Sequence, residues 1–119
     1  MINNKSIKQV YLCLGVTDMR KSINGLSLLV SEKLADDPFN GCLFVFCNRS
    51  RDKLKMLYWE HNGFWLYYKR LEKGKFKWPN TTNESDSLSL DWRELQWLLE
   101  GLSCVQPQAH QALEGLINN

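Results

Sequence analysis

The chain has 119 residues, of which 44% are hydrophobic and 24% are charged, and its net charge is +2. This size and composition predict a globular protein and exclude a disordered chain. No apolar run approaches the ~18 residues of a membrane span, and the apolar stretch near the N-terminus is too short for a secretory signal, so we expect a cytoplasmic protein. We expect a single domain over residues 1–119, with its core at about 8–102 and a weakly structured tail at 103–119.

The N-terminal part of the chain predicts a strand followed by a helix. Residues 9–14 are rich in β formers and are followed by a glycine. Thr17 or Asp18 can cap a helix by accepting hydrogen bonds from its first N–H groups. Apolar residues then recur at helical spacing from Met19 to Leu34, and the acidic residues and proline at 36–38 end the helix.

The middle of the chain predicts an antiparallel β-meander over residues 42–78. The first of its strands is apolar on both faces and is therefore expected to be central, whereas the others alternate and are separated by turns. Asn62 and Gly63 form a hairpin turn in which we expect them to supply positive φ angles. The four predicted strands are 43–47, 53–60, 64–71 and 75–78.

The aromatic residues of this region have two alternative fates. For most of them we expect burial, with Leu54, Met56 and Tyr58 facing the core together with Phe44 and Phe46. The candidates for an exposed stacking face, unless a helix covers them, are Trp59, Trp65 and Tyr67.

After a polar linker at residues 80–87, a second helix is predicted. Asp91 and Glu94 have the spacing of a capping box, an apolar stripe follows from Trp92 onward, and Gly101 is a natural stop. The predicted fold class is α+β: a single domain in which an antiparallel β-meander of about four to five strands packs with two main helices.

Charge is concentrated in one part of the chain. Residues 48–78 carry nine Lys or Arg against three Asp or Glu, a local charge of +6, so the remaining residues sum to −4. Cations interleaved with aromatic rings suit nucleic acid, because phosphates pair with cations and bases stack on rings. The alternative is a meander whose aromatic residues form the core and whose lysines keep the outer face hydrated.

Under the first alternative, these cations hold phosphates without reading sequence. The candidate nucleic-acid-binding residues of the meander are Arg49, Arg51, Lys53, Lys55, Lys69, Arg70, Lys73, Lys75 and Lys77. Arg20 and Lys21, expected in the first turn of the first helix, are a second candidate contact. Cations at that position oppose the helix dipole, so these two are alternatively bonded to a neighbouring loop or acid.

Catalytic and metal-binding patterns are missing from the sequence. No glycine-rich phosphate loop and no nucleophile elbow occurs, and the acidic residues are scattered, so we expect a protein without enzymatic activity, catalytic residues or cofactor. His61 and His110 are isolated, and the cysteines lack zinc-site spacing, so we expect no metal and reduced thiols. The cysteines are Cys13, Cys42, Cys47 and Cys104.

Several sequence blocks together carry a family resemblance. In chain order they are Val16–Lys21 with Gly25-Leu26, Asp37–Gly41 with Leu43–Phe46, Asp52–Trp59, Gly63–Leu66, Lys69–Phe76, Trp78-Pro79 and Leu98–Gly101. Over about residues 10–102 these blocks resemble the accessory protein TnpB, the second-open-reading-frame product of IS-66-type insertion sequences. This family is distinct from the larger RNA-guided nuclease that shares its name.

The resemblance implies a small protein encoded in a mobile element beside a separate transposase. We therefore expect a non-catalytic accessory protein for transposition of a bacterial insertion sequence, which binds DNA through a basic sheet surface. The alternative is an adaptor that binds the transposase without contacting DNA, which Trp92 and Trp97 support because aromatic residues are enriched at interfaces. The sequence leaves the oligomeric state open and predicts no membrane partner.

Overall fold

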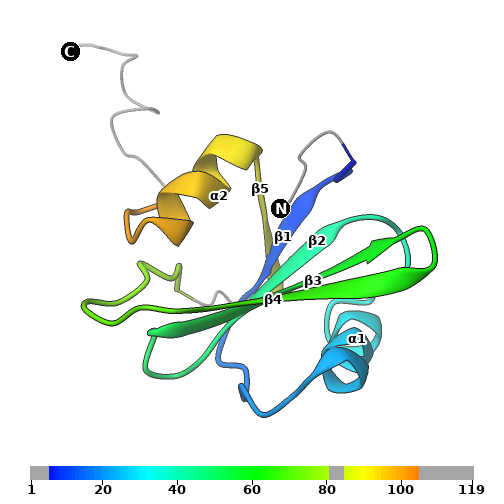
Figure 1. The fold of residues 1–119 in the computed structure, drawn as a ribbon, viewed down its shortest axis with the longest axis horizontal. Helices are drawn as coiled ribbons and strands as arrows, with labels where there is room; N and C mark the ends of the chain where they lie inside the picture. The colour runs from blue at the N-terminus through cyan, green and yellow to red at the C-terminus, as the bar shows by residue number, and fades with distance from the viewer. Residues whose placement is uncertain (1–5, 81–84, 105–119) are drawn as a thin grey trace.

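The computed structural model describes residues 6–80 and 85–104, which form a five-stranded mixed sheet with an α-helix on each face (Figure 1). The strand order is β4-β3-β2-β1-β5, in which β1 and β2 are parallel and the other neighbours are antiparallel. The α+β fold class predicted from the sequence is thus confirmed. The elements are β1 (Val10–Cys13), α1 (Ile23–Glu32), β2 (Leu43–Cys47), β3 (Lys53–Glu60), β4 (Gly63–Arg70), β5 (Ser87–Leu90) and α2 (Trp92–Leu99).

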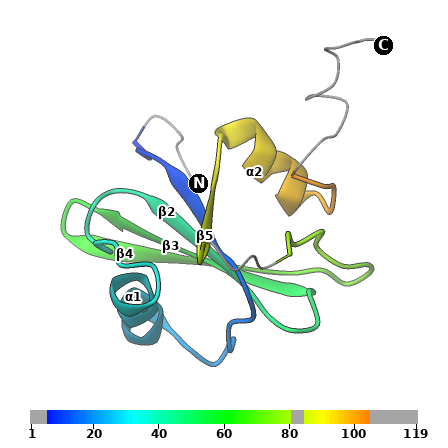
Figure 2. The ribbon, with the colours of Figure 1, turned by 180° about the vertical axis from the view of Figure 1, so that it is seen from behind.

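The sheet has an apolar cluster on each face, and Figure 2 shows α1 and α2 on opposite sides of it. All five residues of β2 are buried, as expected for a central strand. On the α1 face, Phe44 and Phe46 pack with Leu26 and Val30 of the helix. The α2 face holds the larger cluster, to which Leu95 and Leu98 belong.

The predicted facing of β3 is wrong in one respect. Leu54, Met56 and Tyr58 are buried, but on the α2 face and not with Phe44 and Phe46. The reason is register: directly paired residues of antiparallel strands share a face, and the residue opposite Phe44 is the one that follows Met56. Both faces of β3 are therefore core over its middle.

The first helix begins later than predicted. Ser22 is its N-cap, and Arg20 and Lys21 precede the helix instead of forming its first turn. The segment before it is held to the sheet: the Thr17 N–H donates to the Cys47 carbonyl at 2.9 Å. Residues 17–21 form a loop with a turn, in which the Lys21 N–H donates to the Asp18 carbonyl at 3.1 Å, and not the first turn of the helix.

The fourth predicted meander strand, residues 75–78, is not a strand. Its alternation has another origin. Phe76 and Trp78 insert into the α2-face cluster, while the lysines beside them stay exposed. The Phe76 N–H donates to the Arg51 carbonyl at 2.7 Å, which ties this segment to the turn between β2 and β3.

Strand β5 lies at the end of the predicted linker and was not predicted. It pairs antiparallel with β1, with Leu90 opposite Val10 and Leu88 opposite Leu12. The Ser-Leu alternation of residues 87–90 is the sequence signal for it. The predicted tail from residue 105 onward and residues 81–84 of the linker lie outside the described residues.

Two local predictions can be compared directly with the backbone. The β3–β4 hairpin turn is present, but the positive φ angle is at His61 (57°), whereas Asn62 and Gly63 have none. The capping box of α2 is confirmed: the Asp91 carboxylate accepts from the Glu94 N–H at 2.8 Å, and the Glu94 carboxylate accepts from the Asp91 N–H at 2.8 Å.

Candidate nucleic-acid interface

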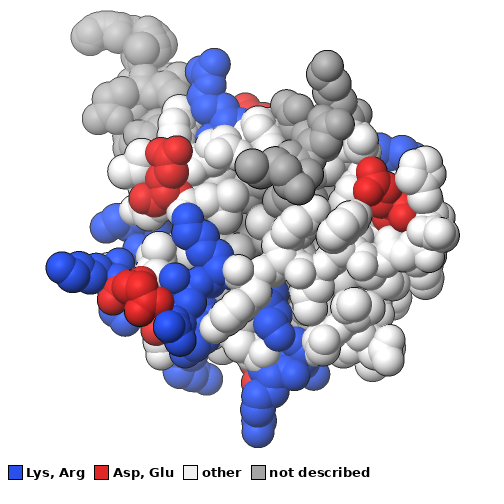
Figure 3. All heavy atoms as spheres, viewed as in Figure 1, with Lys and Arg blue, Asp and Glu red and all other residues white. Residues whose placement is uncertain are grey.

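The candidate cations gather at one end of the molecule, which we call the basic end. It comprises the β2–β3 turn, the adjoining ends of β3 and β4, the segment 71–78 and the loop 16–21. Figure 3 shows Lys and Arg side chains concentrated on this side, whereas the surface around the β3–β4 hairpin is mostly uncharged. The fold thus brings the 16–21 loop, distant in sequence, beside the cationic meander.

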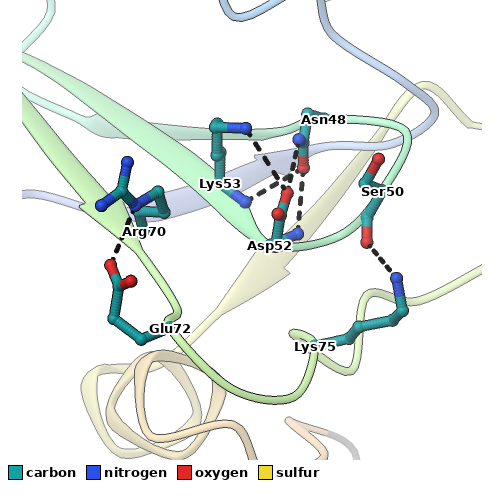
Figure 4. A network of polar contacts seen from close by, with 7 residues as sticks. All are labelled: Asn48, Ser50, Asp52, Lys53, Arg70, Glu72 and Lys75. Carbon is teal, nitrogen blue, oxygen red and sulfur yellow. Dashed lines mark hydrogen bonds and ion pairs between the residues drawn. The ribbon is translucent and has the colours of Figure 1, made fainter.

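The β2–β3 turn is organised by the side chain of Asn48. Its carbonyl oxygen accepts from the backbone N–H groups of Asp52 (3.1 Å) and Lys53 (3.0 Å), and its amide donates to the Asp52 carboxylate at 2.8 Å (Figure 4). The hydrogen bond from Asn48 is the main reason that the pKa of Asp52 is lowered. Arg51 has a φ of 62° in this tight turn, and its buried Nη1 has no hydrogen-bond partner among the described residues.

Lys55 holds the 16–21 loop against the sheet. Its Nζ donates to the carbonyl oxygens of Met19 and Lys21, both at 2.8 Å. Both acceptors are neutral backbone carbonyls, so no carboxylate offsets the positive charge of Lys55 in this contact. Lys55 therefore adds to the positive potential of the basic end but is committed to a structural contact.

Two further lysines connect neighbouring segments in the same way. The Nζ of Lys69 donates to the carbonyl of Leu99, at the end of α2, at 2.8 Å. The Nζ of Lys75 donates to the Ser50 carbonyl at 2.8 Å, which joins the segment after β4 to the β2–β3 turn (Figure 4).

Three more of the cations are paired with carboxylates. The pairs are Arg20–Asp18 (2.7 Å), Arg70–Glu72 (2.9 Å) and Lys53–Asp52 (4.0 Å). The hydrogen bonds from the side chain and backbone of Arg20 lower the pKa of Asp18 to about 2. The predicted alternative for Arg20, bonding to a neighbouring acid, is therefore what the structure shows.

Apart from the half-buried Arg51, the remaining candidate cations have uncommitted charged groups. Within residues 6–80 and 85–104, the side chains of Lys21, Arg49, Lys73 and Lys77 make no hydrogen bond or ion pair, and all four are exposed. These groups can approach a phosphate without first breaking a contact with a described residue. They are the strongest candidates for phosphate contacts.

The aromatic residues expected to form a stacking face are divided. Trp65 is 52% exposed, whereas Trp59 and Tyr67 are half-buried. Trp59 packs at the hairpin end with its ring centroid 4.9 Å from that of Phe39 and 5.0 Å from that of Phe64. Trp65 lies on the other face of the sheet, where it stacks on Tyr67.

Tyr68 is an exposed ring at the basic end that the sequence did not lead us to expect. It is 54% exposed, and it lies directly opposite Lys55 on the α1 face at the basic end. A sequence signal for it existed. The hairpin turn pairs Glu60 with Gly63, and counting back from that pair places Tyr68 opposite Lys55 and beside the predicted cations.

Among the described residues, the cysteines and potential metal ligands form no metal site. The four cysteines are free and buried, and burial raises the pKa of the Cys47 thiol to about 11. Within the described ranges no group of three or more His, Cys, Asp or Glu is placed to hold a metal ion. No helix in the described part of the chain is long and apolar enough to cross a membrane.

Fold and surface define a small α+β protein with one strongly cationic end. Residues 8–109 match the family described as IS66 Orf2 like protein. The chain belongs to this family of insertion-sequence accessory proteins, and the predicted resemblance is confirmed.

Two relatives from Sinorhizobium fredii support this membership. The chain is 37% identical over 100 residues to the uncharacterized protein y4hO, an alignment that covers 84% of this chain and 85% of that protein. It is 38% identical over 85 residues to the uncharacterized protein y4jC, with 71% of each covered. No solved structure matches the chain significantly.

Proposed function

We propose that this protein is a non-catalytic accessory factor in transposition that binds DNA through its basic end. The observation that carries the proposal is the convergence of two sequence-distant cationic segments, the 16–21 loop and residues 48–78, on one end of the molecule. The rest of the chain is net acidic, so the charge is strongly polarised. A polarised surface of this kind attracts and orients a polyanion.

The basic end divides its cations between two tasks. Lys55, Lys69 and Lys75 hold the loop, the end of α2 and the β2–β3 turn in place through backbone carbonyls. Arg49 and Lys73 stand free among the described residues and make the phosphate contacts. Such contacts position a protein on DNA without selecting a sequence, so binding is expected to depend little on base sequence.

The test is DNA binding by two variants with the same change in net charge. Arg49→Glu with Lys73→Glu alters the basic end, and Lys8→Glu with Arg93→Glu alters exposed cations elsewhere. Binding is measured by fluorescence anisotropy on a duplex of the element's terminal repeat. The Kd of the first variant should be at least about tenfold higher than that of the wild type, because phosphate contacts are lost, and the Kd of the second should change little. Equal effects of the two variants would contradict a local interface.

Salt dependence and DNA integrity complete the test. The wild-type affinity should fall steeply as salt rises, and an unrelated duplex should bind with similar affinity. DNA incubated with the protein and Mg²⁺ or Mn²⁺ should remain uncut. Failure to bind any DNA at about 50 mM salt would overturn the proposal.

A second candidate function, an adaptor for the transposase, is favoured by the opposite end of the molecule. There Phe39 is 55% exposed and Trp65 52% exposed, and large exposed apolar side chains mark many protein interfaces. Under this alternative the purified transposase and this protein co-elute without DNA, and Phe39→Ser with Trp65→Ser removes the co-elution. Separate elution with and without DNA would dispose of it.

A further inference from the structure

An open groove at the basic end combines a free aromatic ring with cations. It lies between the 16–20 loop and the β2–β3 turn and has a volume of about 750 Å³, within the range of small-ligand sites. We call it the Tyr68 groove. Its lining includes Val16, Met19 and Tyr68 as apolar surface, and Arg20, Arg49 and Lys53 as cations.

The ring of Tyr68 is held in position but left uncovered. Strand pairing places it opposite Lys55, whose Nζ lies 6.0 Å from the ring centroid. That Nζ also donates to the carbonyls of Met19 and Lys21, so Lys55 links the ring to the 16–21 loop. More than half of the tyrosine remains exposed, although a ring of this size is ordinarily buried where core is available.

The charges that line the groove are net positive. The groove contains one carboxylate, that of Asp18, and both of its oxygens accept hydrogen bonds from the Arg20 guanidinium (2.7 to 3.1 Å). Lys53 has only a long contact to Asp52, at 4.0 Å, and Arg49 has no polar partner among the described residues. Two cations are therefore available to phosphates next to the ring.

A duplex does not match this combination, because its bases are stacked inside and present no free face to a protein ring. An unpaired nucleotide does match it, because it offers a flat face and a flanking phosphate together. Building on the DNA-binding function proposed above, we propose that the Tyr68 groove binds an unpaired nucleotide of single-stranded DNA. The base stacks on Tyr68, and the flanking phosphates contact Arg49 and Lys53.

The experiment measures fluorescence anisotropy with labelled DNA of three kinds: a single strand of thymidines of about 12 nucleotides, an abasic strand of the same length, and a duplex. The wild-type protein should bind the thymidine strand about tenfold more tightly than the abasic strand, since both carry the same phosphates and only one carries bases. Tyr68→Leu should remove this preference by weakening binding to the thymidine strand alone. Tyr68→Phe keeps the ring and should retain the preference.

The matched control is Trp65→Leu, which removes an equally exposed ring from the same strand but from the other face of the sheet. It should leave the preference for bases intact. Thermal unfolding of each variant tests whether the fold survives. The comparison of the thymidine and abasic strands with the wild-type protein does not depend on the folding of any variant.

The outcomes separate this inference from the proposed function. Equal wild-type affinity for the thymidine and abasic strands overturns the stacking role of Tyr68, as does an unchanged preference in Tyr68→Leu, while DNA binding by the basic end stands. If Trp65→Leu loses the preference for bases and Tyr68→Leu keeps it, the bases stack on the opposite face of the sheet, and the proposed role of Tyr68 is overturned. Absence of binding to all three DNAs at about 50 mM salt removes the proposed function and this inference together.

Discussion

The two ends of the β3–β4 hairpin are built from the same pair of strands but have opposite surface chemistry. At the aromatic end, near the turn, the rings of Phe39, Trp59 and Phe64 pack on one another with centroids 4.9 to 5.4 Å apart. At the basic end, Lys53 and Arg70 are paired across the two strands, and Figure 3 shows Lys and Arg side chains concentrated on this side of the molecule.

The difference shows how one hairpin can separate stability from binding. Ring packing at the aromatic end stabilises the fold by removing apolar surface from water. At the basic end the cations cannot be buried, so three lysines instead bind backbone carbonyls and hold the segments together, while others stay free. Substitutions at the two ends should therefore change different properties of the protein.

The largest stability effect is expected at the aromatic end. Trp59→Ala should lower the free energy of unfolding by about 2–4 kcal/mol, because a half-buried ring loses its packing with Phe39 and Phe64. Urea denaturation measures this loss. Trp65→Ala, which removes a more exposed ring, should cost clearly less, and neither variant should weaken duplex binding at the basic end. Equal losses of stability in Trp59→Ala and Trp65→Ala, or weakened duplex binding in Trp59→Ala, would contradict the separation of stability and binding between the two ends.

The next effect concerns a committed cation of the basic end. Lys55→Met should lower the free energy of unfolding by about 1–2 kcal/mol, because the carbonyls of Met19 and Lys21 lose their charged donor. The same denaturation experiment on Lys77→Met, which removes an exposed lysine with no such contact in the described structure, should show a change within about 0.5 kcal/mol. A loss in Lys77→Met as large as that in Lys55→Met would contradict the division into committed and free cations.

A smaller effect is expected for Lys75→Met. Its hydrogen bond to the carbonyl of the exposed Ser50 should contribute about 0.5 kcal/mol or less. Faster amide hydrogen exchange confined to the β2–β3 turn would show that the loss is local. Exchange that is unchanged there would mean that Lys75 does not hold the turn.

The smallest effect on stability is expected when Asp18 is protonated at low pH, although its carboxyl should titrate at an unusually low pH. Its pKa of about 2 lies below its ordinary value of 3.8 because Arg20 donates to the charged form. The folded pKa is the lower one, so any stabilisation is present above pH 3.8 and is lost as the pH falls toward 2. The Asp18 side chain is exposed to solvent, which screens its ion pair with Arg20, so we expect little change in Tm.

Nuclear magnetic resonance titration of the Asp18 carboxyl measures this directly. In Arg20→Met the pKa should rise toward its ordinary value without reaching it, because the side-chain donor is lost while the backbone N–H of residue 20 still donates to the Asp18 carboxylate. An unchanged low value in that variant would show that the Arg20 side chain is not the main cause of the shift.

Local patterns in the sequence predicted much of the fold. The spacing of Asp91 and Glu94 predicted the α2 cap, and the uniformly apolar run of β2 predicted a central strand. Alternation of apolar and polar residues gave a wrong prediction at residues 75–78, because an irregular segment can show the same pattern as a strand. There Phe76 and Trp78 enter the core without pairing in a sheet. Strand β5 was missed because four residues between polar segments carry little signal.

The candidate site was predicted as a set of cations but not as an arrangement. Which lysines are committed depends on backbone carbonyls that the fold brings near, such as that of Leu99 beside Lys69, 30 residues away in the chain. The exposure of Tyr68 depends on the register of β3 and β4 and on how far α1 extends over the sheet.

The sequence by itself determined the fold class, the family, and the concentration of positive charge in one stretch of the chain, because composition, periodicity and family motifs are properties of neighbouring residues. Only the tertiary structure decided which face each aromatic residue occupies and which cations remain free. It also placed the 16–21 loop beside the meander to form the Tyr68 groove. These outcomes follow from contacts between distant segments, where strand register and the need to pair each backbone carbonyl select among arrangements that the local sequence permits equally.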